Sequence, residues 1–185
     1  MKRLFPFVLL LSAIAATPAL ADIQLSAPST ATGSFDVVVE ASNVFAAPHD
    51  ADFLLGYGFN VTFDTALLQF TGETAGPLFT DLSPLPGADV AGVATAILLG
   101  PGDFTEPLEL AVLHFSVIGS GSTSIGINGD PSNLNGGLLY LSESDPISAS
   151  TRLTTSAVAT PEPGTALLLF GALGAVAAGR KLRRA

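Results

Sequence analysis

The side chains best suited to chemistry in this chain of 185 residues are two histidines and a large set of carboxylates. His49 opens a short cluster with Asp50 and Asp52, immediately before an apolar stretch. One imidazole and two carboxylates could touch a divalent ion, but such residues are usually exposed, so a solvated loop is the simpler interpretation. His114 stands between two apolar residues of a strand pattern and faces away from both, so we expect it on the surface or in a groove.

A second set of candidate ligands lies in a glycine-rich loop. Asn128, Asp130, Asn133 and Asn135 offer oxygens of the kind that calcium prefers. Their spacing is not that of an EF-hand, which ends in a bidentate Glu. Asn, Asp and Gly are also the residues that tight turns require. A plain turn cluster and a calcium site therefore both stay open, and calcium is the one cofactor that the sequence suggests.

The chain lacks the motifs of the common catalytic classes. It contains no cysteine, which excludes thiol catalysis, zinc–thiolate sites and iron–sulfur clusters. It has no Gly-x-Ser-x-Gly elbow and no motif that marks a Ser-His-Asp triad, although a triad is assembled in space rather than in sequence. Carboxylate pairs for glycoside hydrolysis are likewise set in three dimensions. We predict no catalytic residues and a protein that is not an enzyme.

The charge of the chain is unevenly distributed. Six of the seven basic residues lie in the two end segments, and Arg152 is the only base between Asp22 and Thr160. The same stretch holds 15 of the 16 acidic residues, so its formal net charge is −14. Such a surface repels phosphate backbones, which excludes nucleic acid as a partner. It keeps an exported domain dispersed and attracts cations as counter-ions.

The elements that must position these side chains have the pattern of β-strands. The clearest is residues 55–63, where Leu, Tyr, Phe, Val and Phe alternate with Gly, Asn and Thr. Gly56 and Gly58 share one face, which indicates a close approach to that surface or a bend. Residues 72–87 are rich in Gly and Pro and are expected to lack regular structure. Further strands are expected at residues 35–40, 67–70, 90–99, 108–118, 122–127, 138–141 and 151–157.

Short strands separated by turn residues, without helical periodicity, predict an all-β fold. We expect an antiparallel jelly-roll-type β-sandwich over residues 22–156. The roughly 139 residues between the end segments are enough to bury about two-thirds of the surface that the unfolded chain exposes. Because there is no cysteine, the core alone must hold the domain together.

The first 21 residues have the three parts of a signal peptide. Lys2 and Arg3 form a basic start, and residues 4–16 form an apolar run. Ala19 and Ala21 supply the small residues of a cleavage site. We therefore predict export and a mature chain that begins at Asp22.

The last residues have the pattern of a membrane anchor. A small polar linker, residues 157–160, precedes an uncharged stretch at 165–179 and a basic cluster of Arg180, Lys181, Arg183 and Arg184. A helix from 164 to 179 would be about 24 Å long, slightly short of a bilayer core of about 30 Å, and snorkelling basic side chains can cover the difference. The basic cluster should stay cytoplasmic, which puts the domain on the opposite side.

Residues 161–185 resemble the PEP-CTERM sorting signal of Gram-negative bacteria. The triplet Pro161, Glu162 and Pro163, the short apolar stretch and the basic cluster occur in the expected order. The resemblance implies recognition by an exosortase, a membrane protease-transpeptidase that processes the tail near the triplet. It also implies an inner-membrane precursor, then a location at the cell surface or outside the cell, in association with extracellular polysaccharide and biofilm.

The middle of the chain is similar to cohesin-type domains over residues 37–44, 55–70 and 110–125. This resemblance implies a jelly-roll sandwich related to carbohydrate-binding modules. Together the two resemblances predict a non-catalytic surface or matrix binding protein whose partners are the exosortase, the membrane, and extracellular polysaccharide or another surface protein. A carbohydrate-binding module is the first alternative, disfavoured because Trp is absent and Tyr57 and Tyr140 are the only tyrosines. A secreted hydrolase is the second alternative.

Overall fold

The computed structural model describes residues 20–96, 98–133 and 135–157, and all regular structure in this part of the chain is β. The all-β prediction is therefore confirmed. None of the described residues belongs to a helix long and apolar enough to cross a membrane. The strands are β1 Asp22–Ser26, β2 Thr30–Ala31, β3 Ser34–Ser42, β4 Leu54–Phe63, β5 Leu68–Ala75, β6 Phe79–Asp81, β7 Val90–Ala94, β8 Leu108–Val117, β9 Gly121–Gly129, β10 Gly137–Tyr140, β11 Ser144–Asp145 and β12 Ile147–Thr155.

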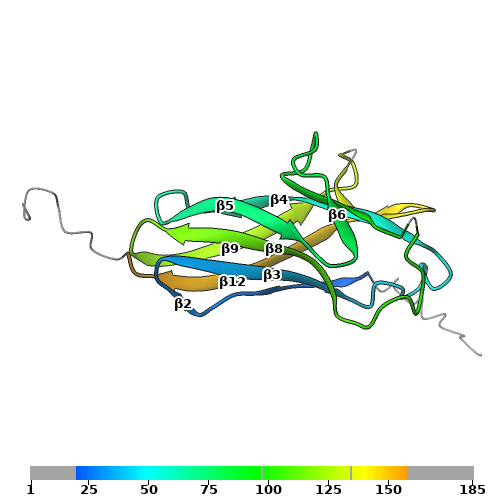
Figure 1. Cartoon of the computed structure of the whole chain (residues 1–185), viewed down its shortest axis with the longest axis horizontal. Coiled ribbons are helices and arrows are strands. Elements are labelled where there is room, and N and C mark those ends of the chain that lie inside the picture. Colours follow the sequence, from blue (N-terminus) through cyan, green and yellow to red (C-terminus); the bar gives the residue numbers. More distant parts are fainter. Residues whose placement is uncertain (1–19, 97, 134, 158–185) are drawn as a thin grey trace, which may run out of the picture.

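The strands form two sheets that pack face to face (Figure 1). The first has the order β1-β3-β8-β5. The second has the order β11-β10-β4-β9-β12-β2, with β7 also paired to β4 and β6 to β7. Every pairing is antiparallel except that of β2 with β12. In Figure 1, β3, β8 and β5 lie in front of β4, β9 and β12.

The core lies between the sheets and follows the period-two pattern of the sequence. Alternate residues of the central strands, such as Val37 and Val39 of β3 and Ile125 of β9, are fully buried. Phe115 of β8 is 0% exposed and stands at the centre of an aromatic cluster. Its ring centroid lies 5.7 Å from Phe35, 5.4 Å from Phe63 and 5.4 Å from Phe70.

The two glycines of β4 mark close approaches of backbone, as their pattern predicts. A Cβ on Gly56 would collide with the carbonyl oxygen of Gly92 in the neighbouring β7. A Cβ on Gly58 would collide with the carbonyl oxygen of Asn135. Residues at these two positions must therefore lack a side chain, so that β7 and the loop before β10 can pack against β4.

Several expected boundaries are wrong. Residues 72–87 are not free of regular structure, because β5 continues to Ala75 and β6 forms within them. β6 exists because β7 supplies its hydrogen-bond partners, which overrides the local excess of Gly and Pro. β7 ends at Ala94 rather than 99, and β12 begins at Ile147 rather than 151, because it pairs along the whole of β9.

Candidate functional site

Three neighbouring strands of the second sheet present a polar outer face, which we call the hydroxyl face. Strands β4, β9 and β12 alternate buried apolar residues with exposed polar ones, and the register aligns the polar positions across the strands. Its members are Asn60, Thr62, Ser122, Ser124, Asn128, Ser148, Ser150, Arg152 and Thr154.

The hydroxyl face carries almost no charge, although the domain around it is strongly acidic. Neither β9 nor β12 contains an Asp or Glu, and Arg152 is the one charged member of the face. Hydroxyl and amide groups can both donate and accept hydrogen bonds. The face is therefore suited to an extended ligand rich in hydrogen-bonding groups, and β9 and β12 place no carboxylate against such a ligand.

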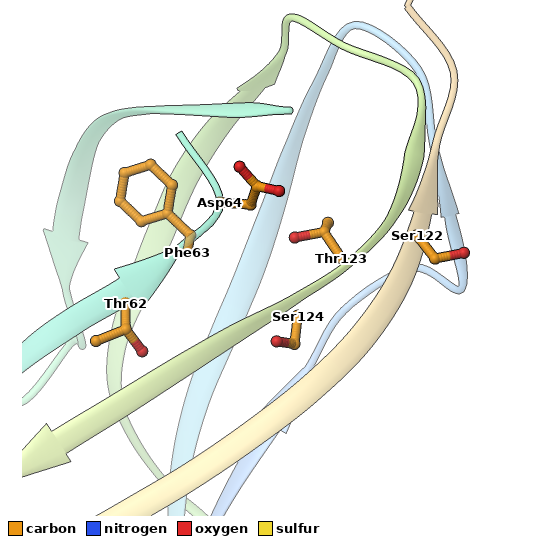
Figure 2. Close-up of a pocket in the computed structure, with 6 residues that line it drawn as sticks. All are labelled: Thr62, Phe63, Asp64, Ser122, Thr123 and Ser124. Carbon is orange, nitrogen blue, oxygen red and sulfur yellow. The ribbon is translucent and has the colours of Figure 1, made fainter. Parts of the chain in front are cut away.

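One end of the hydroxyl face is hollowed. A depression of about 440 Å³ is lined by Thr62, Phe63, Asp64, Ser122, Thr123 and Ser124. Figure 2 shows that these side chains come from the end of β4, the loop that follows it, and the start of β9. A second depression of about 280 Å³ shares its three β9 residues and adds Arg152. Hydroxyl groups, a carboxylate and a guanidinium thus line one connected part of the surface.

Neither tyrosine provides a stacking surface for a sugar ring. Tyr57 is 1% exposed and Tyr140 is 4% exposed. Burial raises the pKa of both phenols well above the usual value, and nearby carboxylates add to the effect. Any carbohydrate contact on the hydroxyl face would therefore rest on hydrogen bonds rather than on tyrosine stacking.

His49 does not lie in a solvated loop, which corrects the simpler interpretation of its sequence cluster. It is only 2% exposed. Its Nδ1 lies 3.2 Å from Oδ2 of Asp52, and its Nε2 lies 3.1 Å from Oδ2 of Asp145 in β11. The ring stacks on Tyr140 with the centroids 3.7 Å apart and the planes at 7°. Asp50, the other acid of the sequence cluster, is exposed.

The carboxylate of Asp52 is held by several donors. Burial opposes its ionisation, but hydrogen bonds from the Ser142 hydroxyl, the Phe53 amide and the His49 ring outweigh this and lower its pKa to about 2. The Phe53 amide donates to Oδ1 at 2.8 Å, and Ser142 donates through its hydroxyl to Oδ2. Asp52 is therefore an anion at any physiological pH and fixes the position of the His49 ring.

His114 lies on the surface of the first sheet, as predicted. Its Nδ1 is 2.8 Å from Oδ1 of Asp36, and its Nε2 is 2.9 Å from Oγ1 of Thr74. This Asp–His–Thr line joins β3, β8 and β5. The side chains of His114 and Asp36 are 36% and 63% exposed, so water screens their interaction. We assign the line a role in linking the three strands.

The structure divides the four calcium candidates between a strand and a turn. Asn128 projects from β9 opposite Asn60 and Ser148, and so belongs to the hydroxyl face. The other three lie in the loop before β10. There Asp130 accepts a hydrogen bond at 2.8 Å from the amide of Ser132, and Asn135 donates from its side-chain amide to the carbonyl of Pro86 at 2.9 Å. These contacts are those of a turn cluster, and calcium binding stays a prediction.

Most of the predicted export and sorting residues lie outside the described residues. This holds for Ala19, Pro161, Glu162 and Pro163, for the apolar stretch 165–179, and for the basic cluster at 180–184. Ala21 is described and lies half-buried immediately before β1. Cleavage after Ala21 would leave the whole of β1 in the mature chain.

The sequence pattern placed Asp52 beside His49, but it did not identify Asp145 as the second partner of the ring. Asp145 is 96 residues further along the chain, in a short edge strand, and no local pattern connects it to His49. The hydroxyl face was visible only as polar alternation in separate strands, because the register that aligns them is a property of the sheet.

Comparisons with known proteins add two findings. The family description "PEP-CTERM protein-sorting motif" matches residues 159–184. Among solved structures, a cohesin module from a family 33 glycoside hydrolase of Clostridium perfringens ATCC13124 superposes with a TM-score of 0.56 at 7% identity, covering 77% of this chain and 100% of that one. A chain from the crystal structure of the CaDoc0917–CaCohA2 complex gives a TM-score of 0.45 at 14% identity, covering 73% and 100%.

No curated protein matches the sequence. Both expected resemblances are confirmed, the first as a motif and the second as a fold. The chain carries a PEP-CTERM protein-sorting motif at residues 159–184, after a β-sandwich whose structural neighbours are cohesin modules.

Proposed function

We propose that this chain is an exported, non-catalytic binding protein of the cell surface or extracellular matrix, delivered through its sorting motif. The observation that carries the proposal is the position of that motif, which starts at residue 159, four residues after β12 ends at Thr155. A sandwich domain of residues 22–156 is thus joined to the sorting signal by a short linker, 157–160.

In this proposal an exosortase reads the triplet at 161–163 while the apolar stretch 165–179 holds the precursor in the inner membrane. The basic residues 180–184 keep their end of the stretch on the cytoplasmic side. Signal-peptide cleavage after Ala21 starts the mature chain at Asp22. Processing then transfers or releases the domain outside the cell.

We infer that the domain binds extracellular polysaccharide through the hydroxyl face. Support comes from the many hydroxyl and amide groups on β9 and β12, from the absence of acidic residues on these strands, and from Arg152, which can pair with an anionic group. The burial of Tyr57 and Tyr140 argues against a module that stacks sugars on tyrosine. Another surface protein is the alternative ligand for the same face.

Replacement of Glu162 by Ala tests delivery. Glu162 lies outside the apolar stretch, so an anchor that is only embedded in lipid does not depend on it. We expect the variant to be exported and to lose its signal peptide, but to accumulate in the membrane at the mass of a chain that starts at Asp22 and keeps its tail. Wild type should lose the tail. Asp50→Ala removes the same charge from the exposed surface and should mature like wild type. Equal masses and locations for wild type and Glu162→Ala would refute processing.

Replacement of Ser124 by Glu tests the binding face. The larger acidic side chain stands at the centre of β9 opposite Arg152, where it obstructs the hydroxyl face and competes for the guanidinium. Ser26→Glu makes the same change on exposed β1 of the other sheet and is the matched control. In co-sedimentation with the exopolysaccharide of the producing cell, Ser124→Glu should lose at least about 1.4 kcal/mol of binding, a tenfold weaker affinity. Equal binding by both variants would show that the polysaccharide is held elsewhere, and capture of a protein instead would favour the alternative.

A further inference from the structure

The buried imidazole of His49 faces a carboxylate at each of its two nitrogens. Asp52 contacts Nδ1 at 3.2 Å, and Asp145 contacts Nε2 at 3.1 Å. Ionised carboxylates only accept hydrogen bonds, and a neutral imidazole has a single N–H. The ring can therefore donate to only one of the two carboxylates, and its other nitrogen presents a lone pair beside a carboxylate oxygen, which together form a pair of ligand atoms that a metal ion can join.

We propose that His49, Asp145 and Glu143 bind a divalent transition-metal ion, with zinc as the type case, and that Asp52 orients the histidine. This site goes beyond the proposed function, since neither the sorting motif nor the hydroxyl face includes it. The three residues can each present a ligand atom, and these atoms lie within 4.8 Å of one another.

The distance between the first two ligands already suits zinc. Bonds of about 2.0–2.1 Å at a tetrahedral angle separate two ligand atoms by roughly 3.3 Å. Nε2 of His49 and Oδ2 of Asp145 are 3.1 Å apart. Glu143 is exposed in the turn between β10 and β11, so a rotamer change can bring its carboxylate closer. Water can take the fourth position on this open side.

The residues around the site fix the orientation of the His49 ring, as metal sites require of a histidine ligand. A carboxylate on the second ring nitrogen is the usual partner of a zinc-bound histidine, because it fixes the tautomer and leaves the other nitrogen free for the metal. Asp52 takes this place on Nδ1. Tyr140 stacks on the ring, and its hydroxyl donates to the carbonyl of the buried Val44 at 2.6 Å, which holds the Tyr140 ring in place against His49.

The mixed donor set distinguishes this site from the predicted calcium loop. Calcium takes oxygen ligands, whereas an imidazole with two carboxylates suits zinc and its neighbours among the transition metals. The ligand and orienting residues include three carboxylates, so a divalent cation also relieves their mutual repulsion.

Titration calorimetry of the full chain in detergent, with zinc as the probe, tests the proposal. We expect one zinc ion to bind per chain. When cobalt replaces zinc, we expect the intense visible absorption of a tetrahedral cobalt ion with nitrogen and oxygen ligands. His49→Gln should abolish binding. Glu143→Gln removes a ligand without touching a buried contact, so it should fold normally and bind at least about tenfold more weakly. His114→Gln is the matched control, because it removes the other histidine from the opposite sheet, and it should bind like wild type.

Thermal melting separates a lost site from a lost fold. Zinc should raise the Tm of wild type and His114→Gln by mass action, and should raise that of Glu143→Gln less. Two results would overturn the proposal. One is the absence of stoichiometric zinc binding by wild type. The other is equal affinity of wild type and Glu143→Gln.

Discussion

Truncation of Phe115 to Ala should destabilise the sandwich more than any single change at the surface. Phe115 is fully buried, and its ring contacts those of Phe35, Phe63 and Phe70, one from β3, one from β4 and one from β5. Removing a buried phenyl ring costs about 3–5 kcal/mol, through lost burial and the cavity that remains. That is a large part of the roughly 5–15 kcal/mol that stabilises a typical domain, and no disulfide offsets it.

The measurement is thermal unfolding of residues 22–160, followed by circular dichroism. At about 2–4 °C per kcal/mol, the Tm should fall by roughly 6–20 °C. Phe53→Ala is the control, since Phe53 is 38% exposed and its truncation should cost about 1 kcal/mol or less. If Phe115→Ala loses no more stability than Phe53→Ala, then the aromatic cluster does not hold the two sheets together, and the reasoning fails.

Two further predictions concern β4. Gly58→Ala should destabilise the domain by about 1–3 kcal/mol, because the new methyl group collides with the carbonyl oxygen of Asn135. Gly121→Ala meets only the end of the Leu67 side chain and should melt near wild type; equal Tm values for the two variants would contradict the packing argument. Burial raises the pKa of Tyr57, so the folded chain keeps this phenol neutral, and the associated stability is present below about pH 10 and is lost as pH rises further. Tyrosinate absorbance should therefore stay absent near pH 10 until the chain unfolds, and its growth in a folded chain would refute the burial.

The central strands could be predicted from sequence because the alternation of apolar and polar residues is a local feature of the chain. Residues 55–63 alternate strictly, and the structure extends β4 over them almost unchanged. Edge strands such as β6 and β11 could not be predicted, since a partner strand stabilises them and their own residues contribute little. The sorting motif did not depend on any partner strand. It was recognisable because a tail of this kind is identified by its linear order of residues. The contact of His49 with Asp145 depends on the fold that joins them, and no sequence pattern announced it.

The pairing of β12 with β9 also sets where the depression lies relative to the tail. Ser122, in the wall of the depression, is opposite Thr154, and the sorting motif begins at residue 159. In the proposed precursor the apolar stretch begins at residue 165, and the ten peptide steps from Thr155 to this residue span at most about 36 Å when fully extended. The depression is thus tethered close to the lipid surface, where a long polymer has less room to approach. Removal of the tail would lift this steric shield, so the start of binding would be timed by processing rather than by synthesis or folding.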